Sequence, residues 1–137
     1  MFWNKKPKYE FSKQSLANLK TCDKRLQKLF NEVIKHFDCS IIGGYRSDSE
    51  QDYYFKKGLT KLSKGKSKHN LQPSQAVDVC PYPIDWNNHK RYILLAGYVK
   101  GIASQMNIKI RWGGDWDSDN IMKDQTFNDL PHFEIID

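Results

Sequence analysis

The sequence predicts an α+β fold in which helices pack against a small, mainly antiparallel sheet. Four short apolar runs, each typical of a strand, alternate with segments whose apolar residues recur at helical spacing. The connections between the runs vary too much in length for regular parallel winding. The chain has 137 residues, of which 39% are hydrophobic and 13% aromatic, and this is enough for one packed core. We therefore expect a single domain over residues 1–137.

The first part of the chain is predicted to be helical and to lead into a strand. Apolar residues recur at helical spacing over 12–37, and Asp23 can cap a second helix within this region. The apolar run 39–42 predicts a strand, which the pair Gly43-Gly44 then turns.

A capping box marks the next helix. Ser47 stands at the N-cap position and Glu50 three residues later, which predicts a helix from about 48 to 57 that stops at Gly58. Residues 58–75 are expected to form a loop, because they hold glycines, a proline and many lysines.

The second half supplies three strands and one helix. The apolar run 76–80 predicts a strand, and the helical spacing of apolar residues predicts a helix over 89–106. Residues 108–112 alternate as a half-buried strand does. The apolar run 132–136 predicts the last strand.

The net charge of the chain indicates which classes of partner it can bind. The formal net charge is +6, which suits an anionic partner such as nucleic acid, acidic lipid or cell-wall polymer. Six lysines lie between Lys56 and Lys68 and form either a solvated loop or a docking surface. No apolar run is long enough for stable membrane insertion. Residues 1–8 lack the apolar segment of a secretory signal, so we expect synthesis in the cytoplasm.

The cysteines are expected to be free thiols. Cys22, Cys39 and Cys80 form no C-x-x-C pair, and their number is odd. Cys39 and Cys80 lie in apolar strand-like runs, so we interpret them as small core residues.

Three residues at distant positions suggest a metal centre. Asp78 lies within an apolar run, where an unpaired carboxylate is costly and favours a cation nearby. His69 precedes it in the loop, and His132 opens the last strand. Two imidazoles and a carboxylate, with one position open for water, are typical of a catalytic zinc site. Asp129, three residues before His132, is expected to project into the same cleft with a different role.

Two further groups have open interpretations. Arg46 follows the first strand at the start of a helix, where it is either a surface charge or a clamp for a substrate carboxylate, with Gln51 beside it. Asp115, Asp117 and Asp119 imitate the opening of an EF-hand loop, but the loop lacks the glycine at position six and the glutamate at position twelve. They form either a solvated acidic loop or a calcium site.

Three ordered motifs resemble a known family. They are Ser67-x-His69…Ala76-Val77-Asp78, then Trp112-Gly113-Gly114-Asp115-Trp116, then Asp129-x-x-His132-x-Glu134. They are similar to the LAS-type zinc peptidases, which comprise D-alanyl-D-alanine carboxypeptidases and L-alanyl-D-glutamate endopeptidases, and among these to small single-domain phage endolysins. The resemblance covers roughly residues 38–137.

The resemblance implies a role for each site residue. His69, Asp78 and His132 would hold zinc in a cleft over the sheet, and Asp129 would be the general base. Arg46 would steady the substrate or the charge that develops on its scissile carbonyl. Ser67 would hydrogen-bond into the site, and Glu134 would either orient a ligand histidine or serve as a fourth ligand.

The sequence departs from the family pattern in two ways. The spacing from His69 to Asp78 is nine residues instead of the common seven, and Gln72-Pro73-Ser74 fills the gap, so the entrance to the site is expected to differ. The base is an aspartate where carboxypeptidase-like members often carry glutamate, which hints at the endopeptidase branch.

The implied function is that of a zinc-dependent peptidoglycan hydrolase, an endolysin that cleaves the L-alanyl-D-glutamate bond of stem peptides during host lysis. With no signal segment, a holin would have to release it to the wall; a monomer is the default. The alternatives are a D-alanyl-D-alanine carboxypeptidase or dipeptidase on the same scaffold, a basic nucleic-acid-binding protein or nuclease, and a non-catalytic wall-binding module. Against the nucleic-acid alternative, no DNA- or RNA-binding motif is found.

Overall fold

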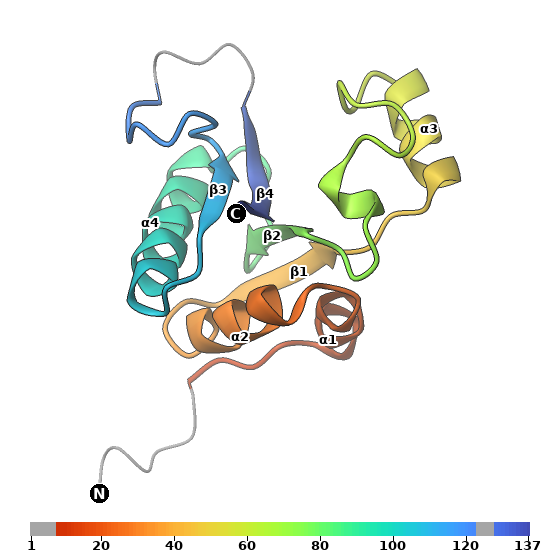
Figure 1. Cartoon of the computed structure of the whole chain (residues 1–137). Coiled ribbons are helices and arrows are strands. Elements are labelled where there is room, and N and C mark those ends of the chain that lie inside the picture. Colours follow the sequence, from red (N-terminus) through yellow and green to blue (C-terminus); the bar gives the residue numbers. More distant parts are fainter. Residues whose placement is uncertain (1–7, 123–127) are drawn as a thin grey trace, which may run out of the picture.

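The computed structural model describes residues 8–122 and 128–137, so most of the segment on which the absence of a secretory signal was predicted lies outside them. Its centre is a four-stranded antiparallel sheet in the order β1-β2-β4-β3, which confirms the predicted α+β class (Figure 1). The strands, in chain order, are β1 (Cys39–Gly43), β2 (Ala76–Pro81), β3 (Ile110–Gly113) and β4 (Asp129–Ile135).

Three helices pack on this sheet. The predicted helical region divides into α1 (Lys13–Lys20) and α2 (Lys24–Val33), and the Asp23 side chain caps α2 by accepting from the Arg25 backbone N–H at 2.9 Å. The long helix α4 (His89–Gln105) lies against α2 and the sheet. Apolar residues from these helices meet those of β2 and β4 in the core, where the Phe30 and Phe133 rings contact edge to face at 5.6 Å.

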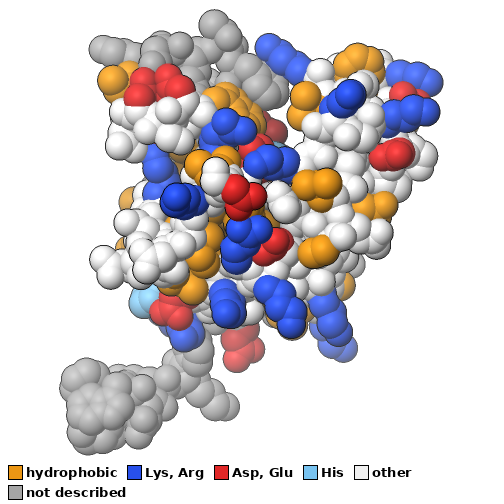
Figure 2. All heavy atoms as spheres, viewed as in Figure 1, with side chains coloured by type: hydrophobic (Ala, Val, Ile, Leu, Met, Phe, Trp, Pro, Cys, Tyr) orange, Lys and Arg blue, Asp and Glu red, His pale blue; other side chains and the backbone are white. Residues whose placement is uncertain are grey.

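The fourth helix, α3 (Asp48–Lys56), stands apart from the other three, across β4 from α4 (Figure 1). Its predicted capping box is present, with Ser47 and Glu50 exchanging hydrogen bonds. We call residues 45–70, which comprise α3, the loop after it and the short 3₁₀ helix η2 (Lys68–Asn70), the α3 lobe. Lys and Arg side chains are spread over the face seen in Figure 2, including this lobe.

Several boundaries differ from the sequence prediction. The segment 58–75, predicted to be loop throughout, contains η2. The strand predicted over 108–112 is formed by 110–113. The last strand begins at Asp129 instead of residue 132. The proline at position 131 fits within β4 because the pairing of β3 with β4 is irregular at this point, and a bulge tolerates a residue without an N–H.

Gly113 makes that irregular pairing feasible. It pairs with Asp129, and a Cβ at this glycine would lie 2.1 Å from the Asp129 carbonyl oxygen. Only glycine therefore permits the two backbones to approach so closely, and this approach fixes where the chain enters the sheet at Asp129.

No helix in the described residues is both long and apolar enough to cross a membrane.

Candidate metal centre and cleft

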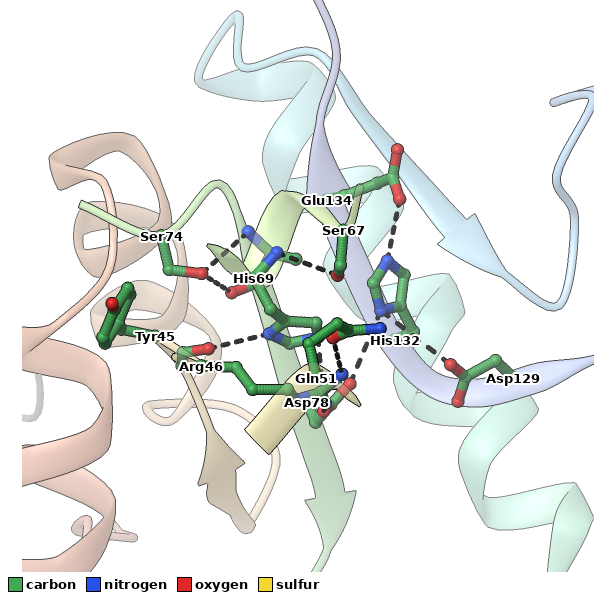
Figure 3. Close-up of polar contacts among 12 residues, drawn as sticks. Tyr45, Arg46, Gln51, Ser67, His69, Ser74, Asp78, Asp129, His132 and Glu134 are labelled. Atoms are coloured by element: carbon green, nitrogen blue, oxygen red, sulfur yellow. Dashed lines mark hydrogen bonds and ion pairs between the residues drawn. The ribbon is translucent and has the colours of Figure 1, made fainter. Parts of the chain in front are cut away.

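The three predicted metal ligands converge on one point from three elements (Figure 3). His69 comes from η2, Asp78 from β2 and His132 from β4, and each offers one ligand atom within 4.8 Å of the others. Asp78 and His132 are register partners on neighbouring strands, so the sheet itself sets their separation. His69 is brought to them by the α3 lobe, since its carbonyl accepts from the Arg46 backbone N–H at 2.8 Å.

His69 presents a buried nitrogen to this point. Its Nδ1 lies 2.7 Å from the Gly44 carbonyl oxygen, so Nδ1 carries the proton and donates. Its Nε2 then holds a lone pair, lies 3.3 Å from Asp78 Oδ2, and has no hydrogen-bond partner among the described residues. A buried lone pair without a donor is costly, and a cation between the three side chains would satisfy it. The residues present therefore fit a metal ion.

His132 divides its two nitrogens between two tasks. Nδ1 faces Asp78 Oδ1 at 3.5 Å, whereas Nε2 lies 2.8 Å from Glu134 Oε1. Arg111 donates to the other Glu134 oxygen at 2.8 Å. Glu134 thus binds the edge of the imidazole that points away from Asp78. This arrangement favours the orienting role for Glu134 over that of a fourth ligand.

Electrostatic attraction between Asp78 and the two histidines shifts the pKa values of the site. Burial raises the pKa of the Asp78 carboxyl, but the neighbouring His69 and His132 outweigh it, and that pKa lies well below its usual range. Burial lowers the pKa of His132, but the hydrogen bonds to Asp78 and Glu134 raise it to about 9. His132 is therefore protonated at neutral pH when no metal is bound. Since a metal needs the neutral imidazole, metal binding would release this proton.

Asp129 lies beside the ligand set without belonging to it. Its Oδ2 is 3.9 Å from His132 Nδ1, and its side chain is 39% exposed towards the cleft. Burial and the negative charge of Asp78 raise the pKa of the Asp129 carboxyl, although the nearby His132, His69 and Arg46 oppose this. A carboxylate with a raised pKa accepts a proton more readily, and this one is open to substrate.

Arg46 turns into the site and is not a free surface charge. It donates to Gln51 Oε1 at 2.8 Å and to Asp78 Oδ2 at 3.4 Å, and its guanidinium lies 4.6 Å from the centre of the Tyr54 ring. Gln51 is fully buried and donates to the Leu62 carbonyl at 2.6 Å. The predicted pair is thus adjacent, and Gln51 connects Arg46 with the loop that follows α3.

Ser67 lines the cleft, and its predicted hydrogen bond into the site stays a prediction. Its hydroxyl accepts from the His69 backbone N–H at 3.1 Å and caps η2. It therefore shapes the turn that carries His69, and its recorded bond is to backbone instead of to a group in the cleft.

The acidic loop does not support the calcium prediction. Ligand oxygens of Asp115, Asp117 and Asp119 do lie within 4.8 Å of one another. Asp115, however, is buried, and its Oδ2 already accepts from Lys100 Nζ at 3.1 Å and from the Asn120 backbone N–H at 2.8 Å. The ammonium supplies the positive charge that a cation would bring. The solvated interpretation is correct for Asp117 and Asp119 and wrong for Asp115; loop position twelve, residue 126, lies outside the described residues.

A cleft of about 690 Å³ lies between the α3 lobe and the sheet at this site. The six lysines predicted as a unit are split: Lys61, Lys66 and Lys68 line the cleft, whereas Lys56 pairs with Asp52 on the helix surface. Several residues that line the cleft were not singled out from the sequence, among them Trp86 and Arg111. Arg111 had one signal, its place on the outward side of an alternating strand.

The cysteines are free and buried, as predicted. Burial raises the pKa of the Cys22 and Cys39 thiols to about 12, so neither is a thiolate nucleophile at neutral pH.

Comparisons with known proteins place these observations in a family. A family model described as phage L-alanyl-D-glutamate peptidase matches residues 8–136. The peptidoglycan L-alanyl-D-glutamate endopeptidase CwlK of Bacillus subtilis (strain 168) is 27% identical over 117 residues, which are 74% of this chain and 63% of that protein. The chain thus spans less than two thirds of the length of this relative.

Two solved structures share the fold. The L-Ala D-Glu endopeptidase ChiX of Serratia marcescens matches with a TM-score of 0.75 at 23% identity, covering 94% of this chain and 92% of that one. The D,D-pentapeptidase VanY from a VanB-type vancomycin resistance cassette, solved in complex with Zn(II), matches with a TM-score of 0.52 at 19% identity, covering 95% and 81%.

Proposed function

Because the chain belongs to the phage L-alanyl-D-glutamate peptidase family, we propose that it is a zinc-dependent peptidoglycan hydrolase that cleaves the L-alanyl-D-glutamate bond of cell-wall stem peptides. The observation that carries this proposal is the buried, unpartnered Nε2 of His69, which faces Asp78 and His132 beside the exposed carboxylate of Asp129. CwlK, which carries the same activity in its name, supports the choice of bond.

His69, Asp78 and His132 would hold the zinc ion. Bound there, zinc would supply Lewis-acid chemistry, which activates water and polarises a carbonyl. The donor set of two imidazoles and one carboxylate matches catalytic zinc sites, and the Zn(II) complex of VanY supports zinc as the metal of this fold.

Asp129 and Arg46 would do the rest of the chemistry. Asp129 would accept a proton from the attacking water and then donate it to the amine of the leaving D-glutamate. Arg46, held at 3.4 Å from Asp78 by its bond to Gln51, would stabilise negative charge on the scissile carbonyl oxygen. Glu134 would keep the His132 ring in orientation through Nε2.

The D-alanyl-D-alanine carboxypeptidase alternative rests on the same scaffold, which VanY also has. The family match and CwlK favour the endopeptidase. The two activities differ in product, since the first releases D-alanine and the second leaves a new amino-terminal D-glutamate.

We also propose how the protein acts in its setting. The described residues build one sheet with its helices, which supports a single peptidase domain. We propose a monomer as its working form. As a phage-family lysis enzyme it would reach the wall after release through a holin.

The test combines metal analysis with product analysis. The purified protein is assayed for metal and then incubated with purified peptidoglycan, and the fragments are identified by mass spectrometry. We expect one zinc per chain and new amino-terminal D-glutamate on the stem peptides. Release of D-alanine alone would move the enzyme to the carboxypeptidase branch, and a protein with neither zinc nor cleavage would refute the proposal.

A further inference from the structure

An exposed tryptophan lines the cleft at the end away from the α3 lobe. Trp86 is 56% exposed, and it borders the same cavity as Asp129 and Pro131. It belongs to the loop 82–88 between β2 and α4. Its ring is therefore available for contact with a ligand in the cleft.

This tryptophan is held in place although it is exposed. Its ring stacks on Tyr92 of α4 at 6.2 Å with an interplanar angle of 23°, and Tyr92 is only 3% exposed. Arg91 donates to the Tyr82 carbonyl at 3.0 Å and anchors the backbone of the same loop. One side of the loop is therefore braced against a buried ring, so that a ligand on Trp86 would meet a preorganised surface.

The cleft has two chemically different ends. At the level of Asp78, β2 pairs with Gly43, where the chain leaves for the α3 lobe; at Pro81, three residues on, it pairs with Cys39 and continues into the Trp86 loop. The α3 end carries cationic side chains on the cleft wall, namely Arg46, Lys61, Lys66 and Lys68. The other end presents Trp86 and Pro131, and Arg111, which lines the cleft from β3, has its charge paired with Glu134 at 2.8 Å.

The substrate has the same two-sided chemistry. In the stem peptide, the nitrogen of L-alanine is acylated by the lactyl group of a muramyl sugar, so a sugar ring lies directly before the residue whose carbonyl is cut. The residues after the cut begin with D-glutamate and carry free carboxylates. A pyranose ring offers an apolar C–H face that packs on an aromatic ring, whereas carboxylates suit lysines and arginines.

From this match we propose that Trp86 stacks on the muramyl sugar and so places the glycan strand at the Trp86 end and the anionic peptide at the α3 end. The inference rests on the proposed function. It assigns Trp86 a part in substrate specificity and gives the scissile peptide one direction in the cleft.

The experiment compares two substrates that differ only in the sugar. One is a disaccharide-linked stem peptide, and the other is the same peptide with an acetyl group on L-alanine. We expect the wild-type protein to show a higher kcat/KM for the sugar-linked form. Trp86→Ala should reduce the ratio of the two kcat/KM values by roughly threefold to tenfold, and Trp86→Tyr, which keeps a ring, should restore most of it.

Tyr82→Ala is the matched control, because Tyr82 is 55% exposed on the same loop but does not line the cavity; its ratio should equal that of the wild type. A wild-type protein that cleaves both forms equally, or a Trp86→Ala variant with an unchanged ratio, would overturn the sugar contact and leave the proposed function standing. Failure to cleave either form would overturn both.

Binding gives a second readout. In an Asp129→Asn background, titration calorimetry with the sugar-linked fragment should show a Kd raised by roughly threefold to tenfold when Trp86→Ala is added. Equal Kd values would contradict the contact, whatever the turnover.

Discussion

The chemistry of this site depends on how single side chains divide their polar atoms. His132 gives Nε2 to Glu134 and turns Nδ1 to Asp78, and His69 gives Nδ1 to the Gly44 carbonyl and turns Nε2 to the same carboxylate. In both histidines one nitrogen is fixed by a partner so that the other is available. The protein thus sets the orientation of both rings before any metal arrives.

Asp129 is predicted to be required for turnover but not for metal binding, since it stands beside the ligands at 3.9 Å from His132. Asp129→Asn should retain zinc and lower kcat by roughly a hundredfold to ten-thousandfold, the usual contribution of a general base. Steady-state kinetics on a stem-peptide fragment and metal analysis measure the two effects. Asp117→Asn, on an exposed acidic residue, is the control. Full activity of Asp129→Asn would remove this residue from the mechanism.

Local sequence patterns identified the residues of the site, but they did not predict which of these residues contact one another. His69, Asp78 and His132 each stand out within their own segment, and the structure brings them together. The bond from Arg111 to Glu134 joins two strands that are separated along the chain. This contact has no local signal, because it depends on the register of β3 against β4.

At the scale of elements, caps and periodicity determine most boundaries. The capping box at Ser47 and the cap at Asp23 mark the starts of α3 and α2 as expected. The start of β4 was predicted three residues too late, because the prediction rested on the apolar run 132–136, whereas residues 129–131 join the strand through an irregular pairing with β3. The break between α1 and α2 also connects the helices to the strand that carries Asp78. The Asp23 backbone N–H donates to the Ser74 carbonyl at 2.8 Å, just before β2.

The Asp23 cap is predicted to stabilise the fold in a pH-dependent way. Asp23→Ala should lower the free energy of unfolding by about 1 kcal/mol at pH 7. Hydrogen bonds from Arg25 lower the pKa of the Asp23 carboxyl. With the folded pKa below the unfolded one, the charge contributes stability above about pH 4 and this contribution is lost as the pH falls further.

Urea unfolding at pH 7 and at pH 3 measures this effect. Asp23→Asn is the matched variant, because asparagine caps about as well as aspartate but cannot ionise. The wild type should lose stability relative to Asp23→Asn on acidification. An equal difference at both pH values would show that the charge of Asp23 contributes nothing.

The whole molecule combines a net charge of +6 with a cleft whose α3 end is lined by three lysines and Arg46. The fold class followed from the alternation of strands and helices, but the strand order β1-β2-β4-β3 did not, because short apolar runs do not specify their neighbours. The cleft could not be foreseen for the same reason, since it lies between a sheet and a lobe whose relative placement is set by long-range contacts.

Attachment to the anionic wall is predicted to weaken with salt, because raising the ionic strength from 0.1 M to 1 M shortens the screening length from about 10 Å to about 3 Å. Sedimentation of the Asp129→Asn protein with purified wall sacculi over this range measures the bound fraction, which should fall steadily.

A pair of charge variants locates the effect. Lys66→Gln, in the cleft, should weaken binding at low salt, whereas Lys13→Gln, at the start of α1, should change it little. Binding that does not respond to salt, or that responds equally to both variants, would contradict an electrostatic role for the cleft wall.

The pairing of Asp78 with His132 across β2 and β4 has a consequence for folding. Side chains alternate between the faces of a sheet, so a slip of one residue would turn one of these ligands to the opposite face and destroy the site. A misaligned chain would then lack the means to hold the ion, and the ion would favour only the correctly aligned form. If the chain binds zinc as proposed, the ion would select for correct strand alignment, and a stoichiometric metal content would report a correctly folded population.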